Sequence, residues 1–116
     1  MVGMTHYPKV TLRIEIAPNL KVGPGKILLL EKIAQTGSIS AAARSMDMSY
    51  RRAWLLIDEL KTILGGPAVI TSAGGTGGGG ARLTDAGENL IVKFRTVESR
   101  LLADSAGFLR SLKIQN

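Results

Sequence analysis

The sequence predicts a mainly α-helical domain with a small β wing, built as one unit from the whole chain of 116 residues. Three observations lead to this expectation. Helical apolar patterns recur in the first half of the chain, strand-forming residues flank a run of glycines, and a final helical pattern is long for so small a chain. A chain of this length with 45% hydrophobic residues has enough apolar side chains for one core.

The first two elements follow from periodicity and from residues that end regular structure. Apolar and polar residues alternate along residues 10–17, which predicts a strand with one buried and one solvated face, ended by Pro18 and Asn19. A helix is predicted over residues 24–36, because it opens on proline and is followed by Gly37.

Two further helices are predicted over residues 39–46 and 49–64, joined by a tight turn. Ser38 or Ser40 can cap the first of them by accepting a backbone hydrogen bond. Asp47 suits the turn because aspartate tolerates the left-handed conformation. The second helix has apolar residues at the 3.6-residue period, which indicates one buried face.

Six of the seven residues from Gly74 to Gly80 are glycine, and this run allows two readings. A glycine-rich loop between a strand and a helix can bind phosphate through backbone N–H groups, whereas glycines at the tip of a hairpin need no ligand. Strand-like residues on both sides favour a wing over residues 68–83. The Gly-Lys-Ser/Thr of a Walker loop is absent, since the run ends Gly80-Ala81-Arg82.

A long helix is predicted over residues 84–113, capped by Thr84. Its apolar residues follow three- and four-residue steps as far as Leu101, after which Asp104 and Gly107 interrupt the pattern. A second copy of the chain is the expected partner, which predicts a homodimer, although packing on its own domain produces a similar stripe.

Composition narrows the partners and the chemistry. A net charge of +6 favours a polyanionic partner, of which nucleic acid is the commonest, while a merely basic surface is the alternative. The partner expected here is double-stranded DNA. The chain has no cysteine, and its single histidine cannot build a metal site or a triad alone. We therefore expect no catalytic residue, metal or cofactor, no membrane span, and a cytoplasmic protein that is not an enzyme.

The predicted order of elements is that of a winged helix-turn-helix, a DNA-binding architecture. On its second helix, Arg51 points away from the buried face and Arg52 lies at the edge of that face; arginine suits contacts to guanine and to phosphate. Ser49 and Tyr50 can bind phosphate at the helix start. Trp54 is expected to pack into the core, against the wing or the first helix.

The sequence resembles the N-terminal DNA-binding domain of the ModE-type molybdate-responsive regulators, which is akin to the LysR-type winged helix-turn-helix. The resemblance covers about residues 23–101. It rests on four motifs: Thr36-Gly37-Ser38-Ile39-Ser40 followed by Ala43, Ser49-Tyr50-Arg51-Arg52-Ala53-Trp54 with Ile57, the glycines from Gly74 to Gly80 with Ala81, and Leu83-Thr84 with Gly87.

This resemblance implies a dimeric transcriptional regulator with the helix after Ser49 in the major groove and the glycine loop as a wing. Carried over by position, the residues at the DNA are Ser38, Ser49, Tyr50, Arg51 and Arg52, with Thr76 and Arg82 in the wing. Family members continue into molybdate-binding modules, whereas this sequence ends at Asn116. We therefore expect that the chain is a stand-alone DNA-binding regulator or that its effector module is a separate protein.

The leading prediction is sequence-selective DNA binding by a homodimer that regulates transcription. An adaptor protein that docks a regulatory partner through its C-terminal helix is the alternative. A small nucleotide-binding enzyme is the third, weaker hypothesis, because no second βαβ strand follows the glycines.

Overall fold

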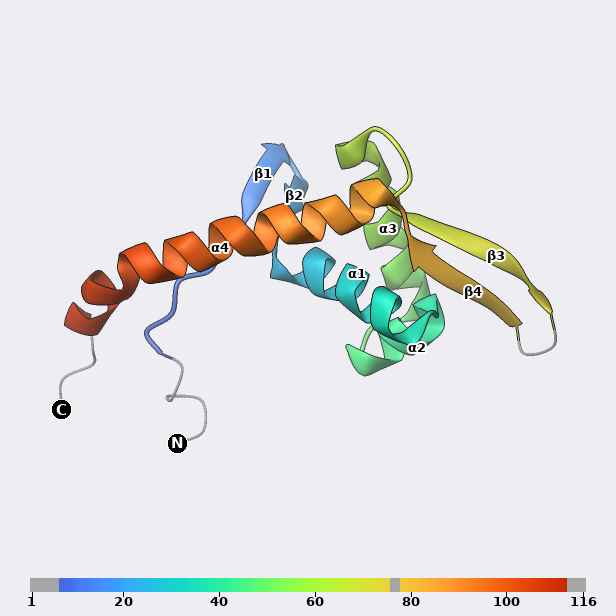
Figure 1. Cartoon of the computed structure of the whole chain (residues 1–116), viewed down its shortest axis with the longest axis horizontal. Coiled ribbons are helices and arrows are strands. Elements are labelled where there is room, and N and C mark those ends of the chain that lie inside the picture. The colour runs from blue at the N-terminus through green and yellow to red at the C-terminus, as the bar shows by residue number, and fades with distance from the viewer. Residues whose placement is uncertain (1–6, 76–77, 113–116) are drawn as a thin grey trace.

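The computed structural model describes residues 7–75 and 78–112 (Figure 1). Figure 1 shows the shorter helices gathered into a body, a long helix lying across them, and a β-hairpin that projects at the opposite end from the free end of the long helix. The elements in chain order are β1 (Ile14–Ala17), β2 (Leu20–Val22), α1 (Pro24–Thr36), α2 (Ile39–Ser45), α3 (Tyr50–Leu64), β3 (Val69–Gly75), β4 (Gly78–Leu83) and α4 (Asp85–Ser111). The predicted fold class, a mainly helical winged helix-turn-helix followed by a long helix, is confirmed.

The N-terminal strand differs from the prediction in length and in burial. Residues 10–13 are not strand, and β1 pairs antiparallel with a second strand, β2, which was not predicted. Pro18 and Asn19 form the turn of this hairpin, with Asn19 at φ 64 in the left-handed region. All four residues of β1 are exposed, because nothing packs on the outside of a two-stranded ribbon. Val22 of β2 enters the core instead, at 2% exposure.

The core is centred on α1. Leu29, Leu30 and Ile33 are fully buried between α2, α3, the base of the wing and α4. The helices can cross closely because the facing positions are small: Ala42 and Ala53 are both 0% exposed.

Capping residues fix the helix ends. Ser38 Oγ accepts a hydrogen bond from Ala41 N at 3.1 Å, and Ser49 Oγ accepts one from Arg52 N at 3.0 Å. Each such cap stabilises a helix by about 1 kcal/mol. Asp47 adopts φ 52 in the turn between α2 and α3, as its residue type predicted.

One hydrogen bond joins the wing to the body, and another closes the base of the wing itself. Ala81 N of β4 donates to the carbonyl of Gly37, the residue that ends α1, at 2.9 Å. At the wing's base, Thr84 N donates to Ala68 O at 2.9 Å. A Cβ on Gly87 would lie 2.4 Å from that same carbonyl, so only glycine allows α4 to start this close to the wing.

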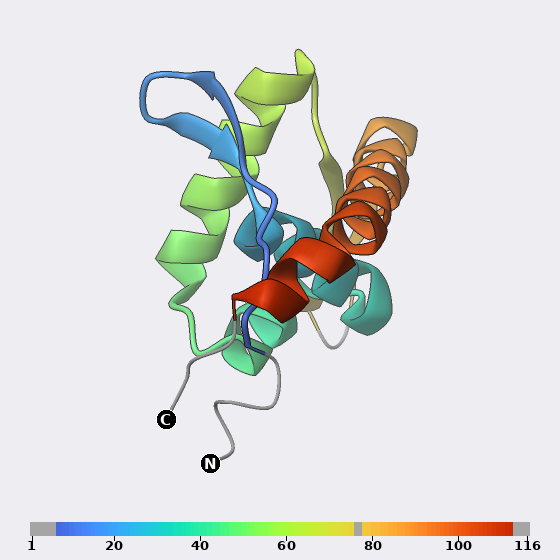
Figure 2. The same cartoon turned by 90° about the vertical axis from the view of Figure 1, so that its left-hand side faces the viewer.

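The first half of α4 packs on the body, and the second half extends beyond it (Figures 1 and 2). Phe94 is 3% exposed in a small cluster with Val22 and Ile27. Arg95 donates to both carboxylate oxygens of Glu31 on α1, at 2.7 and 3.1 Å. These hydrogen bonds raise the pKa of Arg95, because they stabilise the charged form of its guanidinium. Within the described ranges, no helix is long and apolar enough to cross a membrane.

Candidate nucleic-acid interface

The exposed side of α3 presents different residue types in three strips. Its buried face is formed by Ala53, Leu56, Ile57 and Leu60. At about 100° per residue, Arg51 and Leu55 lie on the side opposite this face, and both are exposed. Arg52 lies on one edge, and Tyr50 and Trp54 lie on the other, toward the wing. Arg51 and Arg52 therefore have the directions on α3 that the sequence predicted.

Neither arginine of α3 is neutralised within the part of the chain that the structure describes. The ion pairs found there join Lys26 to Glu59 and Arg95 to Glu31 and Glu98. Arg51 and Arg52 stand at the first turn of α3, exposed and without a carboxylate partner among these residues. Guanidinium groups in this state can bind phosphate or base edges without first breaking an internal ion pair.

The serine hydroxyls expected at this surface have structural roles. Of the two serines predicted as possible caps of α2, Ser38 is the cap. Its Oγ also lies 3.1 Å from Ser40 Oγ, so the two hydroxyls are hydrogen-bonded to each other. Ser49 Oγ caps α3 through Arg52 N. Ser49 is exposed and its hydroxyl proton is not used by this cap, so it can still donate to a ligand.

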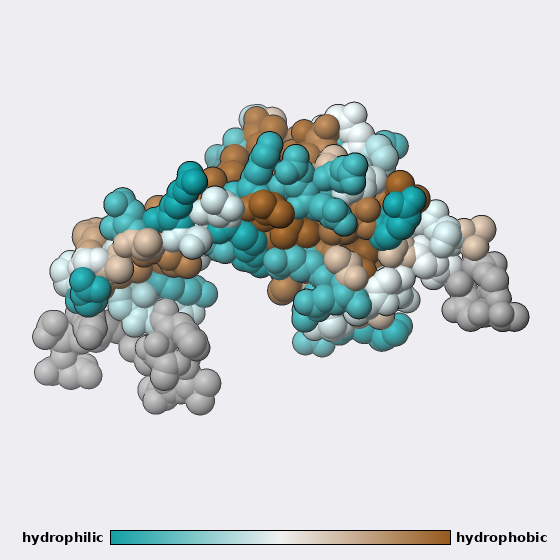
Figure 3. Space-filling model, in the orientation of Figure 1, coloured by the Kyte–Doolittle hydropathy of each residue, from teal (hydrophilic) through white to brown (hydrophobic). Residues whose placement is uncertain are grey.

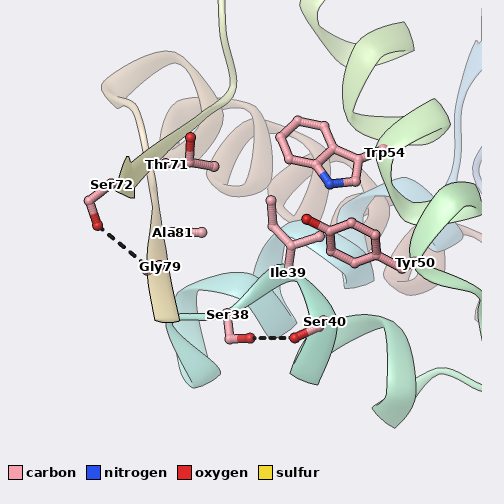
Figure 4. Close-up of a pocket in the computed structure, with 10 residues that line it drawn as sticks. Ser38, Ile39, Ser40, Tyr50, Trp54, Thr71, Ser72, Gly79 and Ala81 are labelled. Atoms are coloured by element: carbon pink, nitrogen blue, oxygen red, sulfur yellow. Dashed lines mark hydrogen bonds between the residues drawn. The ribbon is translucent and has the colours of Figure 1, made fainter. Parts of the chain in front are cut away.

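A cleft of about 510 Å³ separates the helix-turn-helix from the wing (Figure 4). Figure 4 shows Tyr50 and Trp54 of α3 on one side, Thr71 and Ala81 of the wing on the other, and Ser38 and Ser40 of α2 at one end. The full lining consists of Ser38, Ile39, Ser40, Tyr50, Trp54, Thr71, Ser72, Gly79, Gly80 and Ala81.

Trp54 is not the core residue that the sequence predicted. It is 38% exposed and meets Tyr50 edge to face, with ring centroids 6.2 Å apart and an interplanar angle of 77°. It does face the wing, but across a cleft rather than in close packing. The sequence spacing could have indicated this exposure: Trp54 is four residues after the exposed Tyr50 and therefore lies beside it on the helix surface.

The wing divides its residues between two faces. Thr71 pairs with Ala81 and faces the cleft, whereas the next pair toward the base, Ile70 and Arg82, lies on the other face. Arg82 and Ile70 line a separate hollow there together with Gly37. Arg82 is thus in the wing, as expected, but it is not brought together with the arginines of α3. Thr76 lies outside the described residues.

The glycine run belongs to a hairpin. β3 and β4 are antiparallel, with Gly75 opposite Gly78, and α4 begins only after β4 has returned to the body. A phosphate-binding loop requires the glycines to lead directly into a helix N-terminus, so this arrangement contradicts the nucleotide-binding reading. Among the described residues, no group of three or more His, Cys, Asp or Glu side chains could hold a metal ion.

Comparison with known proteins now gives a family. Residues 25–88 match the family described as "Bacterial regulatory helix-turn-helix protein, lysR family". The chain belongs to this family. The matched segment runs from the first turn of α1 through the helix-turn-helix and the wing to the first turn of α4. The prediction that the chain is not an enzyme agrees with membership of this LysR family of regulatory proteins.

Individual relatives include the proteins named in the resemblance. The chain is 43% identical over 74 residues to the "Molybdenum transport protein ModE" of Herbaspirillum seropedicae, covering 64% of this chain and 28% of that protein. It is 39% identical over 83 residues to the "DNA-binding transcriptional dual regulator ModE" of Escherichia coli K12, covering 72% and 32%.

It is also 39% identical over 94 residues to the "Molybdenum-pterin-binding protein MopB" of Rhodobacter capsulatus, covering 81% of this chain and 35% of that protein. The predicted ModE-like character of this LysR-family chain is confirmed. The chain spans about a third of the length of the curated relatives that it matches.

Proposed function

We propose that this chain binds operator DNA as a homodimer and regulates transcription. The observation that carries the proposal is the pair of exposed arginines, Arg51 and Arg52, at the start of the second helix of a helix-turn-helix. Both are exposed, and neither has a carboxylate partner in the described part of the chain. The name of the Escherichia coli relative, a DNA-binding transcriptional dual regulator, supports the same function.

In this proposal α3 enters the major groove with its first turn leading. Arg51, opposite the buried face, reaches base edges, and Arg52 at the edge of the helix reaches phosphate. The hydroxyls of Ser49 and Ser38 contact the flanking phosphates. The wing follows the neighbouring backbone, where Arg82, on the outer face, and Thr76 supply contacts that do not depend on sequence.

The free half of α4 supports the homodimer. Leu90 and Phe94 face the body, and the same side of the helix continues beyond the body as Val97, Leu101 and Phe108. Val97 is 46% exposed and Phe108 is 66% exposed. In Figure 3 the projecting part of α4 shows apolar residues beside polar ones, whereas the end near α2 is mainly hydrophilic. In a homodimer, the same apolar side of α4 from a second copy would cover Val97 and Phe108.

One alternative uses the same observation. The exposed apolar side of α4 also fits an adaptor that docks a regulatory protein, and a separate effector protein could bind there in addition to DNA. A regulator that binds bacterial DNA would work in the cytoplasm, where that DNA is found, and an adaptor for such a regulator would work there too. Measurement of the mass in solution distinguishes the two: a dimer in the absence of other proteins favours self-association, and a monomer favours the adaptor.

Selection of bound duplexes from a random-sequence library tests the DNA-binding proposal. We expect a two-fold symmetric motif whose half-sites are about one helical turn, 34 to 36 Å, apart. Recovery of no enriched motif, with equal affinity for every duplex, would contradict sequence-selective binding. Recovery of a single unpaired half-site would contradict the homodimer but not DNA binding.

A further inference from the structure

We propose that Trp54 contacts DNA, and that the cleft between α3 and the wing holds a segment of the sugar-phosphate backbone to which the Trp54 N–H and the Tyr50 hydroxyl donate hydrogen bonds. This inference rests on the proposed function and adds to it a DNA-contacting residue and a binding site for one DNA strand. The cleft lies between the two elements that the proposal places on the DNA, so a strand that spans them crosses it.

The lining of the cleft fits a phosphodiester. It contains five hydroxyl groups and one indole N–H, and no acidic side chain that would repel a phosphate. The volume of about 510 Å³ is within the range of sites that hold small organic groups, so there is room for a nucleotide-sized segment.

Two donors in the cleft are available. The hydrogen bonds drawn between the lining residues join Ser38 to Ser40 and Ser72 to the backbone of the wing, and none reaches Tyr50 or Trp54 (Figure 4). The Trp54 ring is held in place by its edge-to-face contact with Tyr50, so little side-chain freedom is lost when it binds.

The absence of charge in the lining favours DNA over a free anion. An isolated phosphate in the cleft would have no counter-charge, and its transfer from water would be unfavourable. A DNA strand is instead held by arginines outside the cleft, at the start of α3, and then needs only neutral donors along its path. The aromatic pair therefore positions a backbone that other residues attract.

A single tryptophan makes the test direct, because Trp54 is the only one in the chain and its fluorescence reports on the cleft alone. The probe is a duplex recovered by selection from the random-sequence library. In the unmodified protein, saturating duplex should quench or shift the emission and protect it from acrylamide. Unchanged emission and unchanged acrylamide quenching in the bound complex would overturn the inference.

Two substitutions test the donors separately. Trp54→Phe keeps an aromatic ring but removes the N–H, and Tyr50→Phe removes only the hydroxyl. Each should weaken binding about tenfold, equally for selected and random duplexes, because one hydrogen bond to a charged group is lost. The slope of log Kd against log salt should stay unchanged, since a neutral donor releases no counterion.

Tyr7→Phe is the matched control, because it removes a hydroxyl from an exposed tyrosine in the N-terminal segment, and it should bind as the unmodified protein does. Wild-type affinity of both cleft variants would overturn the inference while leaving the proposed function intact. A loss confined to selected duplexes would overturn the backbone assignment in favour of base contact. If the unmodified protein itself shows no specific binding, the proposed function has failed instead.

Discussion

α3 and the outer half of α4 both leave side chains exposed, but with opposite chemistry. The exposed side of α3 opens with two arginines, whereas the outer part of α4 exposes Val97, Leu102 and Phe108. Charge without an internal partner fits a polyanion, and apolar area without cover fits another protein surface. The two faces should therefore serve different partners and be separable by mutation.

The largest effect is expected at the start of α4, where the helix lies against the base of the wing. Gly87→Ala should lower the free energy of unfolding by about 3 kcal/mol, because the new methyl group would overlap the Ala68 carbonyl oxygen, which accepts a hydrogen bond from Thr84 N. Chemical denaturation measures this loss. Gly107→Ala, on the same helix, is the control: its nearest neighbour would be the Arg110 guanidinium at 3.7 Å, so it should be neutral or slightly stabilising. Equal stability of both variants would contradict the close approach at Gly87.

The next effect isolates the apolar face of α4. Phe108→Glu should weaken self-association by about 2 to 3 kcal/mol, because it places a charge where an aromatic side chain would be buried. Analytical ultracentrifugation measures the change. Val92→Glu is the matched control, since Val92 is equally exposed but lies on the opposite side of the helix from Leu101. If Val92→Glu disrupts the dimer and Phe108→Glu does not, the interface lies on the other side of α4.

A similar effect on DNA alone is expected from α3. Arg51→Ala should weaken binding to a selected duplex by about 2 kcal/mol and relax the preference at one base pair, while the dimer remains intact. Arg110→Ala removes the same charge from the end of α4 and should have little effect. Competition binding with single-base variants of the duplex provides the measurement. Equal losses for both variants would mean that only net charge matters.

The smallest effect concerns the contact that holds the inner half of α4. Arg95→Ala should lower the free energy of unfolding by about 0.5 to 1 kcal/mol, because the ion pairs with Glu31 and Glu98 are partly exposed and screened by solvent. Thermal unfolding at low and high salt checks this. The difference between variant and wild type should shrink as salt rises, and a difference that is independent of salt would mean that packing dominates.

Local residue chemistry predicted the helices well, for physical reasons visible in the structure. Gly37, Ser49 and Thr84 act within one turn of their own position, and the bounds of α1 coincide with the prediction because proline and glycine mark both ends. The N-terminal hairpin was missed because Pro18 and Asn19 end one strand and also form the turn to the next. The second strand, Leu20–Val22, has only three residues and is too short to show the alternating pattern of a strand.

The position of the wing relative to α3 is the part of the candidate site that the sequence could not predict. The periodicity of α3 placed Arg51 on the exposed side correctly. It could not show that the wing stands away from Trp54 and leaves a cleft, because that spacing depends on how β4 is hydrogen-bonded to Gly37. The same limit applies to Arg82, whose face of the wing is set by the pairing register rather than by its charge.

The specificity ratio of the unmodified protein tests the central claim most directly. It is the ratio of the affinity for a duplex selected from the random library to the affinity for random duplex, measured at physiological salt. A DNA-binding regulator should bind the selected duplex at least about 10³-fold more tightly, with both affinities falling steeply as salt rises. A ratio of one at every salt concentration would contradict the proposed function.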